Sequence, residues 1–271
     1  MYPVLLTIGP IRIYSFGLFL ALGIIMGSFV VWREGRKAKL DEQRLVDFLL
    51  AELFFGLMGA RIYYLLLHFS DFGLAPFKWF LFFHFPGLSF IGAIFGGLIG
   101  ALIFARRQNW SFWQLGDFLV LGLSLGEAIG RIGAFLGGSA YGTITNLPFG
   151  VPMIGLLGKR HPTQIYELIA AILTFVLLVK LEKKWQERQL PTGLNFLFYF
   201  LIFGITRFFL EILRGDSVYF LGWRTTQIVC LFFILSATVF LFRRLGRNLK
   251  TDFLVVLTKI KNLKFKKGNY V

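Results

Sequence analysis

Cysteine is nearly absent from the sequence, and charged residues are scarce. The 271 residues include one cysteine, Cys230, so the chain cannot form an intrachain disulfide. Only 16% of the residues are charged, whereas 56% are hydrophobic and 34 are Phe. This balance excludes the soluble globular classes and is typical of a polytopic membrane protein. Because Cys230 lies inside an apolar segment, we expect it to serve packing and not nucleophilic chemistry.

Long apolar segments recur along the chain. A helix needs about 20 mostly apolar residues to cross a bilayer. Hydropathy indicates seven such segments: 12–32, 45–67, 87–105, 114–136, 164–181, 193–213 and 222–242. The sequence therefore predicts an all-α, polytopic transmembrane helical bundle. Because no repeat or low-complexity linker divides it, residues 1–245 are expected to form one domain, followed by a basic tail over 246–271.

Basic residues gather in alternate connections between these segments. Twenty of them lie in 33–44, 106–107, 180–188 and the region after 242, and only six lie in the N-terminus and the other connections. The positive-inside rule then predicts an outside N-terminus and a cytoplasmic C-terminus. The first segment has its basic residues on the far side, the reverse of a signal peptide, so we expect it to remain as a helix. Topology thus accounts for the net charge of +15, and we expect no nucleic-acid partner.

Two other regions have a distinctive composition. Residues 138–162 are rich in Gly and Pro, which predicts an ordered, non-helical rim at the outer surface. Residues 251–267 interleave apolar residues with lysines, which fits either a helix lying on anionic lipid headgroups or a disordered, solvated tail. The glycine cluster of 92–100 is expected to let membrane helices pack closely.

Three arginines lie inside the apolar segments and away from the segments' first residues: Arg61, Arg131 and Arg207. A charge at bilayer depth costs at least about 2.5 kcal/mol on insertion scales, so such residues usually face a bundle interior or a wet cavity. Arg131 follows Glu127 by four residues, and Arg207 precedes Glu211 by four, so each pair shares one helix face. These charges indicate a membrane site for a polar, anionic molecule.

The surroundings of the arginines suggest two interpretations. A glycine-rich turn follows Arg131, and its backbone N–H groups together with the guanidinium would suit a phosphate. Alternatively, Arg131 pairs with Glu127 only to cancel charge. Arg214 continues the spacing of Arg207 and Glu211 at i+7, where it lines the same site or reaches the outer interface.

A third polar segment begins the fifth apolar region. His161 and Pro162 precede Gln164 and Glu167, with the proline near the expected start of a helix. His161 is therefore either a structural or a catalytic side chain.

Together, the three segments resemble the prolipoprotein diacylglyceryl transferases of bacteria, in the same order and at the same span ends. Further elements similar to that family are Gly17 and Leu18 after Tyr14, the run 59–64, the run 87–90, the run 104–107, and Gln227. The resemblance covers residues 5–245, and its specificity lies in the combination of these elements.

The resemblance implies a multi-pass enzyme of the bacterial cytoplasmic (inner) membrane. It would transfer the diacylglyceryl group of phosphatidylglycerol to the lipobox cysteine of a prolipoprotein signal peptide, among membrane lipids and with no metal or cofactor. Arg131 and Arg207 would hold the phosphate, whose developing charge arginines stabilise strongly in a low-dielectric cavity. Glu211 would orient Arg207, and His161 would complete the catalytic set. The expected lipid-binding residues are Gly130, Arg131, Gly133, Gly142, Gln164, Glu167, Arg214 and Arg61, the last with support of the bundle as its alternative role.

Several positions depart from the family pattern. Ile91 stands where the family typically has a histidine, and Ala134, Gly137 and Ser139 replace common polar residues. A cysteine thiol is mostly protonated at neutral pH, so a substitute base would help the reaction. The local candidates are His161, Glu167 and Glu127. A lipid-binding protein without catalysis, and a small-molecule transporter, are the alternative functions.

Overall fold

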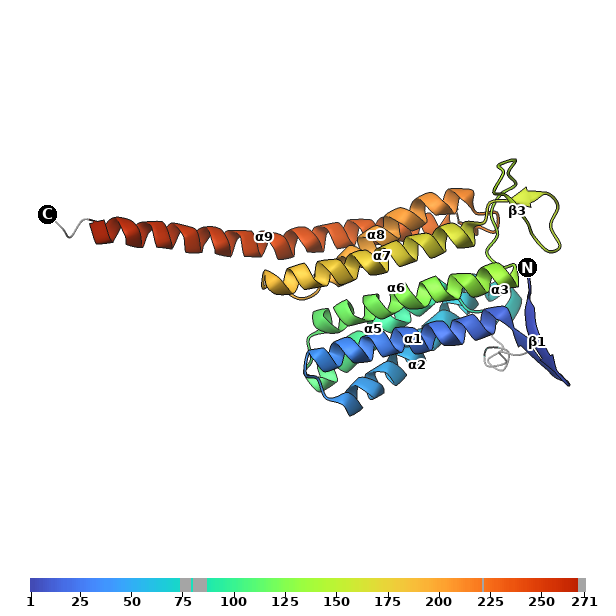
Figure 1. Ribbon diagram of the computed structural model, residues 1–271, viewed down its shortest axis with the longest axis horizontal. Helices are drawn as coiled ribbons and strands as arrows, with labels where there is room; N and C mark the ends of the chain where they lie inside the picture. Colours follow the sequence, from blue (N-terminus) through green and yellow to red (C-terminus); the bar gives the residue numbers. More distant parts are fainter. Residues whose placement is uncertain (74–78, 80–86, 221, 268–271) are drawn as a thin grey trace. The chain divides into compact units, whose positions relative to one another are not determined.

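Seven long helices form most of the chain in the computed structural model, which describes residues 1–73, 79, 87–220 and 222–267 (Figure 1). Each overlaps one predicted segment, so the mostly helical prediction is confirmed. The helices are α1 (Ser15–Lys37), α2 (Glu42–Leu67), α5 (Phe90–Gln108), α6 (Phe112–Gly137), α7 (Thr163–Glu187), α8 (Leu194–Leu210) and α9 (Thr225–Lys267).

Short strands and turns add to the helices. At the N-terminus, β1 (Val4–Ile8) pairs antiparallel with β2 (Ile11–Tyr14), so α1 begins at Ser15 and not at the predicted residue 12. The prediction of helices alone was therefore incomplete, because such short strands leave little periodicity to detect. The remaining short elements are α3 (Phe69–Phe72), β3 (Val151–Pro152), β4 (Lys159–Arg160), η1 (Glu211–Leu213), β5 (Tyr219–Phe220) and β6 (Trp223–Arg224).

Six of the described helical segments are long and apolar enough to cross a membrane: 15–37, 90–108, 112–137, 163–187, 194–213 and 225–246. The protein is therefore a multi-pass membrane protein by length and composition of its helices. Helix α2 forms over the predicted range but is not among these six, so a seventh span remains a prediction.

The chain divides into two compact units. Unit 1 comprises Met1–Ile24 and Leu123–Val271, and unit 2 comprises Ile25–Gly122. Helices α1 and α6 contribute residues to both units, and each unit has its own packing.

In unit 2, α2 and α5 pack through glycines. A Cβ atom added at Gly59 would lie 2.7 Å from the Cα atom of Gly96, and one added at Gly92 would lie 2.5 Å from the Cβ atom of Tyr63. Such contacts leave no room for side chains, so the two backbones approach closely. The packing role predicted for Gly92 and Gly96 agrees with this arrangement.

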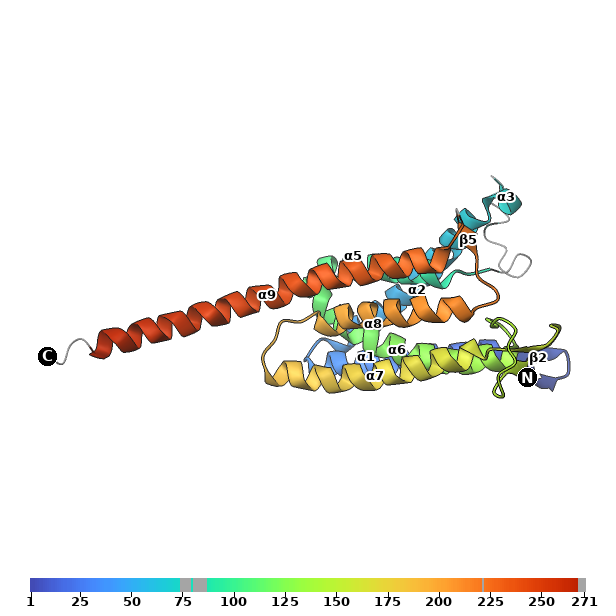
Figure 2. The same cartoon turned by 90° about the horizontal axis from the view of Figure 1, so that it is seen from above.

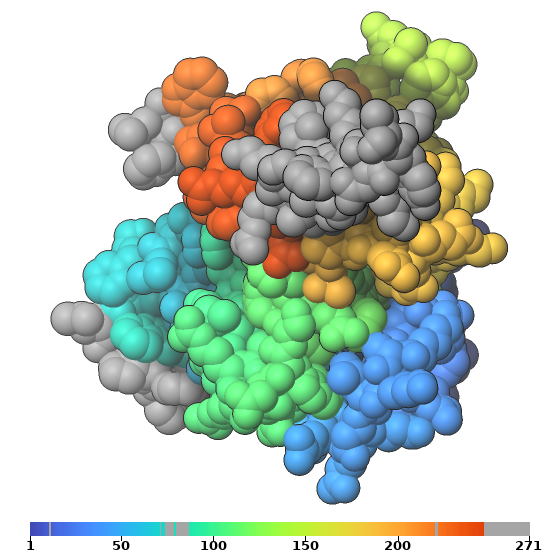
Figure 3. All heavy atoms as spheres, turned by 90° about the vertical axis from the view of Figure 1, so that its left-hand side faces the viewer, coloured from blue at the N-terminus to red at the C-terminus, as the bar shows by residue number. Residues whose placement is uncertain are grey.

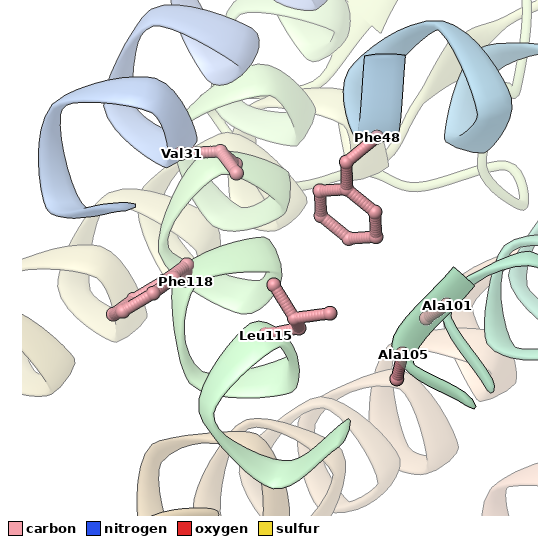
Figure 4. Close-up of a cluster of buried hydrophobic side chains, with 6 residues drawn as sticks. All are labelled: Val31, Phe48, Ala101, Ala105, Leu115 and Phe118. Carbon is pink, nitrogen blue, oxygen red and sulfur yellow. The ribbon is translucent and has the colours of Figure 1, made fainter. Parts of the chain in front are cut away.

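A cluster of buried apolar side chains from α1, α2, α5 and α6 adds to the packing of unit 2 (Figure 4). The centroid of the Phe48 ring lies 5.2 Å from that of Phe104, and Phe48 is fully buried. The cluster consists of Val31, Phe48, Ala101, Ala105, Leu115 and Phe118.

In unit 1, α8 packs against both α7 and α9 (Figure 2). The ring centroids of Phe200 and Phe233 are 4.9 Å apart, and a Cβ atom added at Gly204 would lie 3.1 Å from the carbonyl oxygen of Cys230. The atoms of α8 and α9, orange and red-orange in Figure 3, lie against one another. Cys230 is 1% exposed, in keeping with its predicted packing role.

Unit 1 also contains the segment 138–162 and the basic tail. Residues 138–162 hold the two-residue strands β3 and β4 and no helix, as predicted. Helix α9 continues beyond residue 246 to Lys267, so the backbone of the tail is helical through that residue. Residues 268–271 of the predicted tail lie outside the described residues, and its location on a membrane surface remains a prediction.

Candidate functional site

Glu167 is the centre of a buried ion-pair cluster in unit 1. Its side chain is 3% exposed, and its Oε2 atom lies 2.6 Å from Nη1 of Arg131. Oε1 of the same carboxylate pairs with Arg207 and lies 3.2 Å from Nη1 of Arg214. One carboxylate therefore joins three guanidinium groups that come from α6, α8 and the segment after η1.

The start of α7 fixes the position of Glu167. Gln164 lies one turn earlier on the same helix face, is fully buried, and donates a 2.6 Å hydrogen bond from Nε2 to the carbonyl oxygen of Ser139. The Thr163 hydroxyl donates to the carbonyl oxygen of Ala140 at 2.8 Å. These bonds tie the first turn of α7 to the glycine-rich segment that follows α6.

Glu127 holds the other side of Arg131. Its Oε1 atom lies 2.9 Å from Nη2 of Arg131, the i,i+4 pair that the sequence predicts. The Tyr199 hydroxyl donates to Oε2 of Glu127 at 3.4 Å. Arg131 thus lies between two carboxylates, and Glu127 connects α6 to α8.

Arg207 and Arg214 have carboxylate partners beyond Glu167. Nη2 of Arg207 lies 3.1 Å from Oε2 of Glu211, and Nη2 of Arg214 lies 2.7 Å from Oδ2 of Asp216. The prediction that Arg214 continues the helix face at i+7 was wrong, because α8 ends at Leu210 and Arg214 has an extended backbone after η1. It reaches Glu167 from this extended segment.

The cluster is nearly neutral and largely out of water. Three arginines face Glu127, Glu167 and Glu211, with Asp216 at the more exposed edge. Removing one partner from such a buried network leaves an uncompensated charge, which typically costs about 3–5 kcal/mol. An anionic ligand would therefore bind by taking over guanidinium donors that the carboxylates now occupy.

A small cavity opens beside the cluster. It contains about 340 Å³ of space not filled by atoms, including its opening to solvent. Its lining residues are Glu127, Glu167, Ala170, Ala171, Thr174, Tyr199, Phe203, Thr206, Arg207 and Leu210. The cavity is therefore charged at one part of its wall and apolar over most of the remainder.

The remaining site residues predicted in unit 1 lie around the rim of the cluster. Nδ1 of His161 lies 3.3 Å from the Tyr166 hydroxyl, and His161 does not line the cavity. A Cβ atom at Gly142 would lie 2.6 Å from that of His161, so this glycine permits a close approach of the two segments. Nη1 of Arg160 donates to the Gly142 carbonyl oxygen at 3.2 Å.

The two glycines flanking Arg131 have different surroundings. A Cβ atom at Gly130 would meet nothing within 4 Å, whereas one at Gly133 would lie 2.6 Å from the Cβ atom of Phe19 in α1. Gly133 thus allows α1 and α6 to pack closely. Neither geometry tests the predicted lipid contact.

Arg61 belongs to unit 2. It is 3% exposed, and it donates hydrogen bonds to the carbonyl oxygens of Trp79 at 2.9 Å and Gly87 at 3.0 Å. These bonds attach α2 to the segment preceding α5, which matches the alternative of a supporting role. Its contact with lipid stays a prediction.

Sequence reasoning missed three members of the cluster: Tyr199, Asp216 and Arg224. Nη1 of Arg224 donates to the backbone carbonyl oxygen of Glu211. Tyr199 had a usable signal, because it precedes Arg207 by eight residues, or two steps of four along one helix face. Asp216 lies outside the helices, where residue spacing predicts no shared face.

A metal site has no support among the described side chains, where no group of three His, Cys, Asp or Glu residues could hold a metal ion. The polar groups in the described part of unit 1 instead provide an arginine cluster suited to an anion.

Comparison with known proteins identifies one family and several similar sequences that carry the same name. The sequence model of a family described as prolipoprotein diacylglyceryl transferase matches residues 3–243. A phosphatidylglycerol–prolipoprotein diacylglyceryl transferase of Clostridioides difficile is 31% identical over 251 residues, which cover 91% of this chain and 98% of the relative. Proteins of the same name from Finegoldia magna (31% identity, 91% of this chain and 97% of the relative) and Oceanobacillus iheyensis (33%, 89% and 87%) are similar to it as well.

Proposed function

The chain belongs to the prolipoprotein diacylglyceryl transferase family, and we propose that it transfers the diacylglyceryl group of phosphatidylglycerol to a prolipoprotein. The observation that carries the proposal is the buried cluster of Arg131, Arg207 and Arg214 around Glu167, beside a cavity with mostly apolar walls. Such a site offers guanidinium donors for a phosphate and apolar surface for the attached lipid.

The reaction requires stabilisation of a phosphate leaving group. Sulfur attacks the glycerol carbon of the diacylglyceryl group, the bond from that carbon to the phosphate oxygen breaks, and glycerol phosphate leaves with the bonding electrons. Negative charge then grows on the phosphate, and preorganised arginines in a water-poor site stabilise it. Arg131 and Arg207 hold the phosphate, and Glu211 orients Arg207 through their 3.1 Å contact.

The supporting residues have positioning roles in this proposal. Gln164 and Gly142 fix the segments around the cluster, and Arg214 supplies a third guanidinium. Glu167 holds the three guanidinium groups together before lipid binds. His161 remains a proposed catalytic residue, supported only by its place beside Gly142.

We further propose the topology and location that the charge distribution predicts. Seven helices, including α2, cross the bacterial cytoplasmic membrane, with the N-terminus outside and the C-terminus in the cytoplasm. The acceptor is the lipobox cysteine of a signal peptide. Labelling of single cysteines introduced into a C230A background, with a membrane-impermeant reagent, tests this topology. Labelling near residue 37 in intact cells would contradict it.

The tail of α9 is proposed to bind membrane lipids. Residues 247–267 contain seven basic residues and one acidic residue interleaved with apolar ones, a composition that favours anionic headgroups. A variant ending at Gly246 should then associate less with phosphatidylglycerol-rich vesicles than the full chain. Equal association of the two would contradict this location.

The transfer reaction itself has a direct test. Purified protein is mixed with phosphatidylglycerol and a peptide bearing a lipobox cysteine, and the thioether product is measured by mass spectrometry. We expect product with the wild type and with K183A, an exposed change on α7, and none above background with R131A or R207A. Retained phospholipid binding without product would favour a non-catalytic lipid-binding protein, and uptake into liposomes without either would favour a transporter.

A further inference from the structure

The carboxylates of the cluster differ in how strongly cations hold them. Among the residues that the structure describes, Glu167 contacts three guanidinium groups, whereas Glu127 contacts one, that of Arg131 at 2.9 Å. Both oxygens of Glu167 are therefore engaged by guanidinium groups, whereas Glu127 has one oxygen that no guanidinium of the described residues contacts.

The two oxygens of Glu127 also have different partners. Oε1 accepts the hydrogen bond from the Arg131 guanidinium, and among the described residues Oε2 accepts only a 3.4 Å hydrogen bond from the Tyr199 hydroxyl. Oε2 can therefore accept a proton while Oε1 keeps its hydrogen bond from Arg131. The side chain is 10% exposed and lines the cavity, as do Tyr199 and Arg207.

The other candidate groups are less well placed. Glu211 is 1% exposed, is bound by Arg207 and the Ser217 hydroxyl, and does not line the cavity. His161 faces Tyr166 and does not line the cavity either. Among the described residues, the charged and titratable groups that contact Glu127 or line the cavity with it are Arg131 on α6, Tyr199 and Arg207 on α8, and Glu167 on α7.

We propose that Glu127 is the proton acceptor of the transfer reaction, an inference that rests on the proposed function. Oε2 takes the proton of the acceptor thiol as sulfur attacks the glycerol carbon and the carbon–oxygen bond breaks. The proton then passes to the departing glycerol phosphate, which leaves as its monoanion and restores the carboxylate. Since Glu127 and Arg131 lie one turn apart on α6, a single helix holds the base close to the phosphate-binding arginine.

The test compares a cysteine peptide with a selenocysteine peptide, because a selenol ionises at lower pH than a thiol and needs no base near neutral pH. For E127Q we expect the thiol reaction to fall about 100-fold, the range of general base catalysis, and the selenol reaction to change less than about threefold. E127Q should still fold, because Arg131 keeps its ion pair with Glu167. Retained binding of phosphatidylglycerol verifies that the variant is folded. K183A should keep the wild-type ratio of the two rates.

The variant Y199F provides a second measurement. It removes only the hydroxyl that orients Oε2, so the thiol-to-selenol rate ratio should fall about tenfold with lipid binding retained. If the thiol-to-selenol rate ratio is unchanged in E127Q and Y199F, because both rates are retained or both fall equally, the role of Glu127 is overturned. Absence of product from the wild type with either peptide would instead overturn the proposed function.

Discussion

The two units use different means to hold helices together. In unit 1, three arginines and three glutamates from α6, α7, α8, η1 and the segment after η1 form one buried ion-pair cluster. In unit 2, α2 and α5 meet backbone to backbone at glycines, and the buried cluster of Figure 4 is apolar. Lipid offers no hydrophobic drive for helices to associate, so close packing and polar contacts must supply the attraction.

The two kinds of contact differ in what they offer to a ligand. Glycine contacts fix two helices but offer nothing to a ligand, whereas paired charges in a low-dielectric site can exchange partners when an anion arrives. The carboxylates of unit 1 therefore have two proposed roles. They hold the arginines in place, and they release guanidinium donors when the phosphate of the substrate binds. Removing parts of each unit tests this contrast.

The largest effect is expected from E167A in unit 1. It leaves Arg131, Arg207 and Arg214 without their shared carboxylate, so we expect a loss of about 4 kcal/mol in the free energy of unfolding. Thermal unfolding in detergent, with K183A as the control, measures it. A melting temperature within error of the wild type would mean that the cluster contributes little to stability.

Next in size is the effect of R207K on activity. Lysine keeps the charge but cannot contact two carboxylates or a phosphate through a planar fork, so kcat/KM should fall about 100-fold. Product formation at several phosphatidylglycerol concentrations measures it. Wild-type activity would show that charge alone suffices at this position.

In unit 2, G96L should destabilise the contact of α2 and α5. Even a Cβ atom at residue 96 would lie 3.0 Å from the Cα atom of Gly59, so the larger side chain should cost about 2 kcal/mol through overpacking. The matched control is G56A, whose Cβ would lie 3.8 Å from the Ala93 carbonyl oxygen and should be tolerated. Equal unfolding temperatures for the two variants would contradict close glycine packing.

The smallest effect is expected from E52Q in α2. Oε1 of Glu52 is buried without a hydrogen-bond partner among the described residues, in contrast to the paired glutamates of unit 1. A neutral amide is cheaper to bury than a carboxylate, so stability should stay equal or rise by about 1 kcal/mol. Marked destabilisation in the same unfolding assay would reveal a partner for this carboxylate.

The sequence predicted the helices and the local pairs well. Seven apolar segments became seven helices, and the four-residue spacings of Glu127 with Arg131 and of Arg207 with Glu211 became ion pairs. Both predictions depend on geometry within one helix, which hydropathy and spacing capture.

Hydropathy and residue spacing did not predict the central position of Glu167 in the ion-pair cluster. It arises because α6, α8 and the segment after η1 bring three arginines to one carboxylate of α7, and residue spacing along the chain does not encode such contacts. Arg214 illustrates the same limit, since the end of α8 at Leu210 changed its direction. The resemblance to a family predicted that the arginines bind phosphate. The contacts of Tyr199 with Glu127 and of Asp216 with Arg214 could be identified only from the three-dimensional structure.

The burial of Cys230 has a consequence for a protein that modifies thiols. The chain's single sulfhydryl is 1% exposed, packed where α8 meets α9, so the enzyme presents no thiol of its own to compete with the incoming prolipoprotein. Incubation with phosphatidylglycerol alone should therefore leave the mass of the protein unchanged. The packing between α8 and α9 therefore also keeps the enzyme from attaching a diacylglyceryl group to its own cysteine.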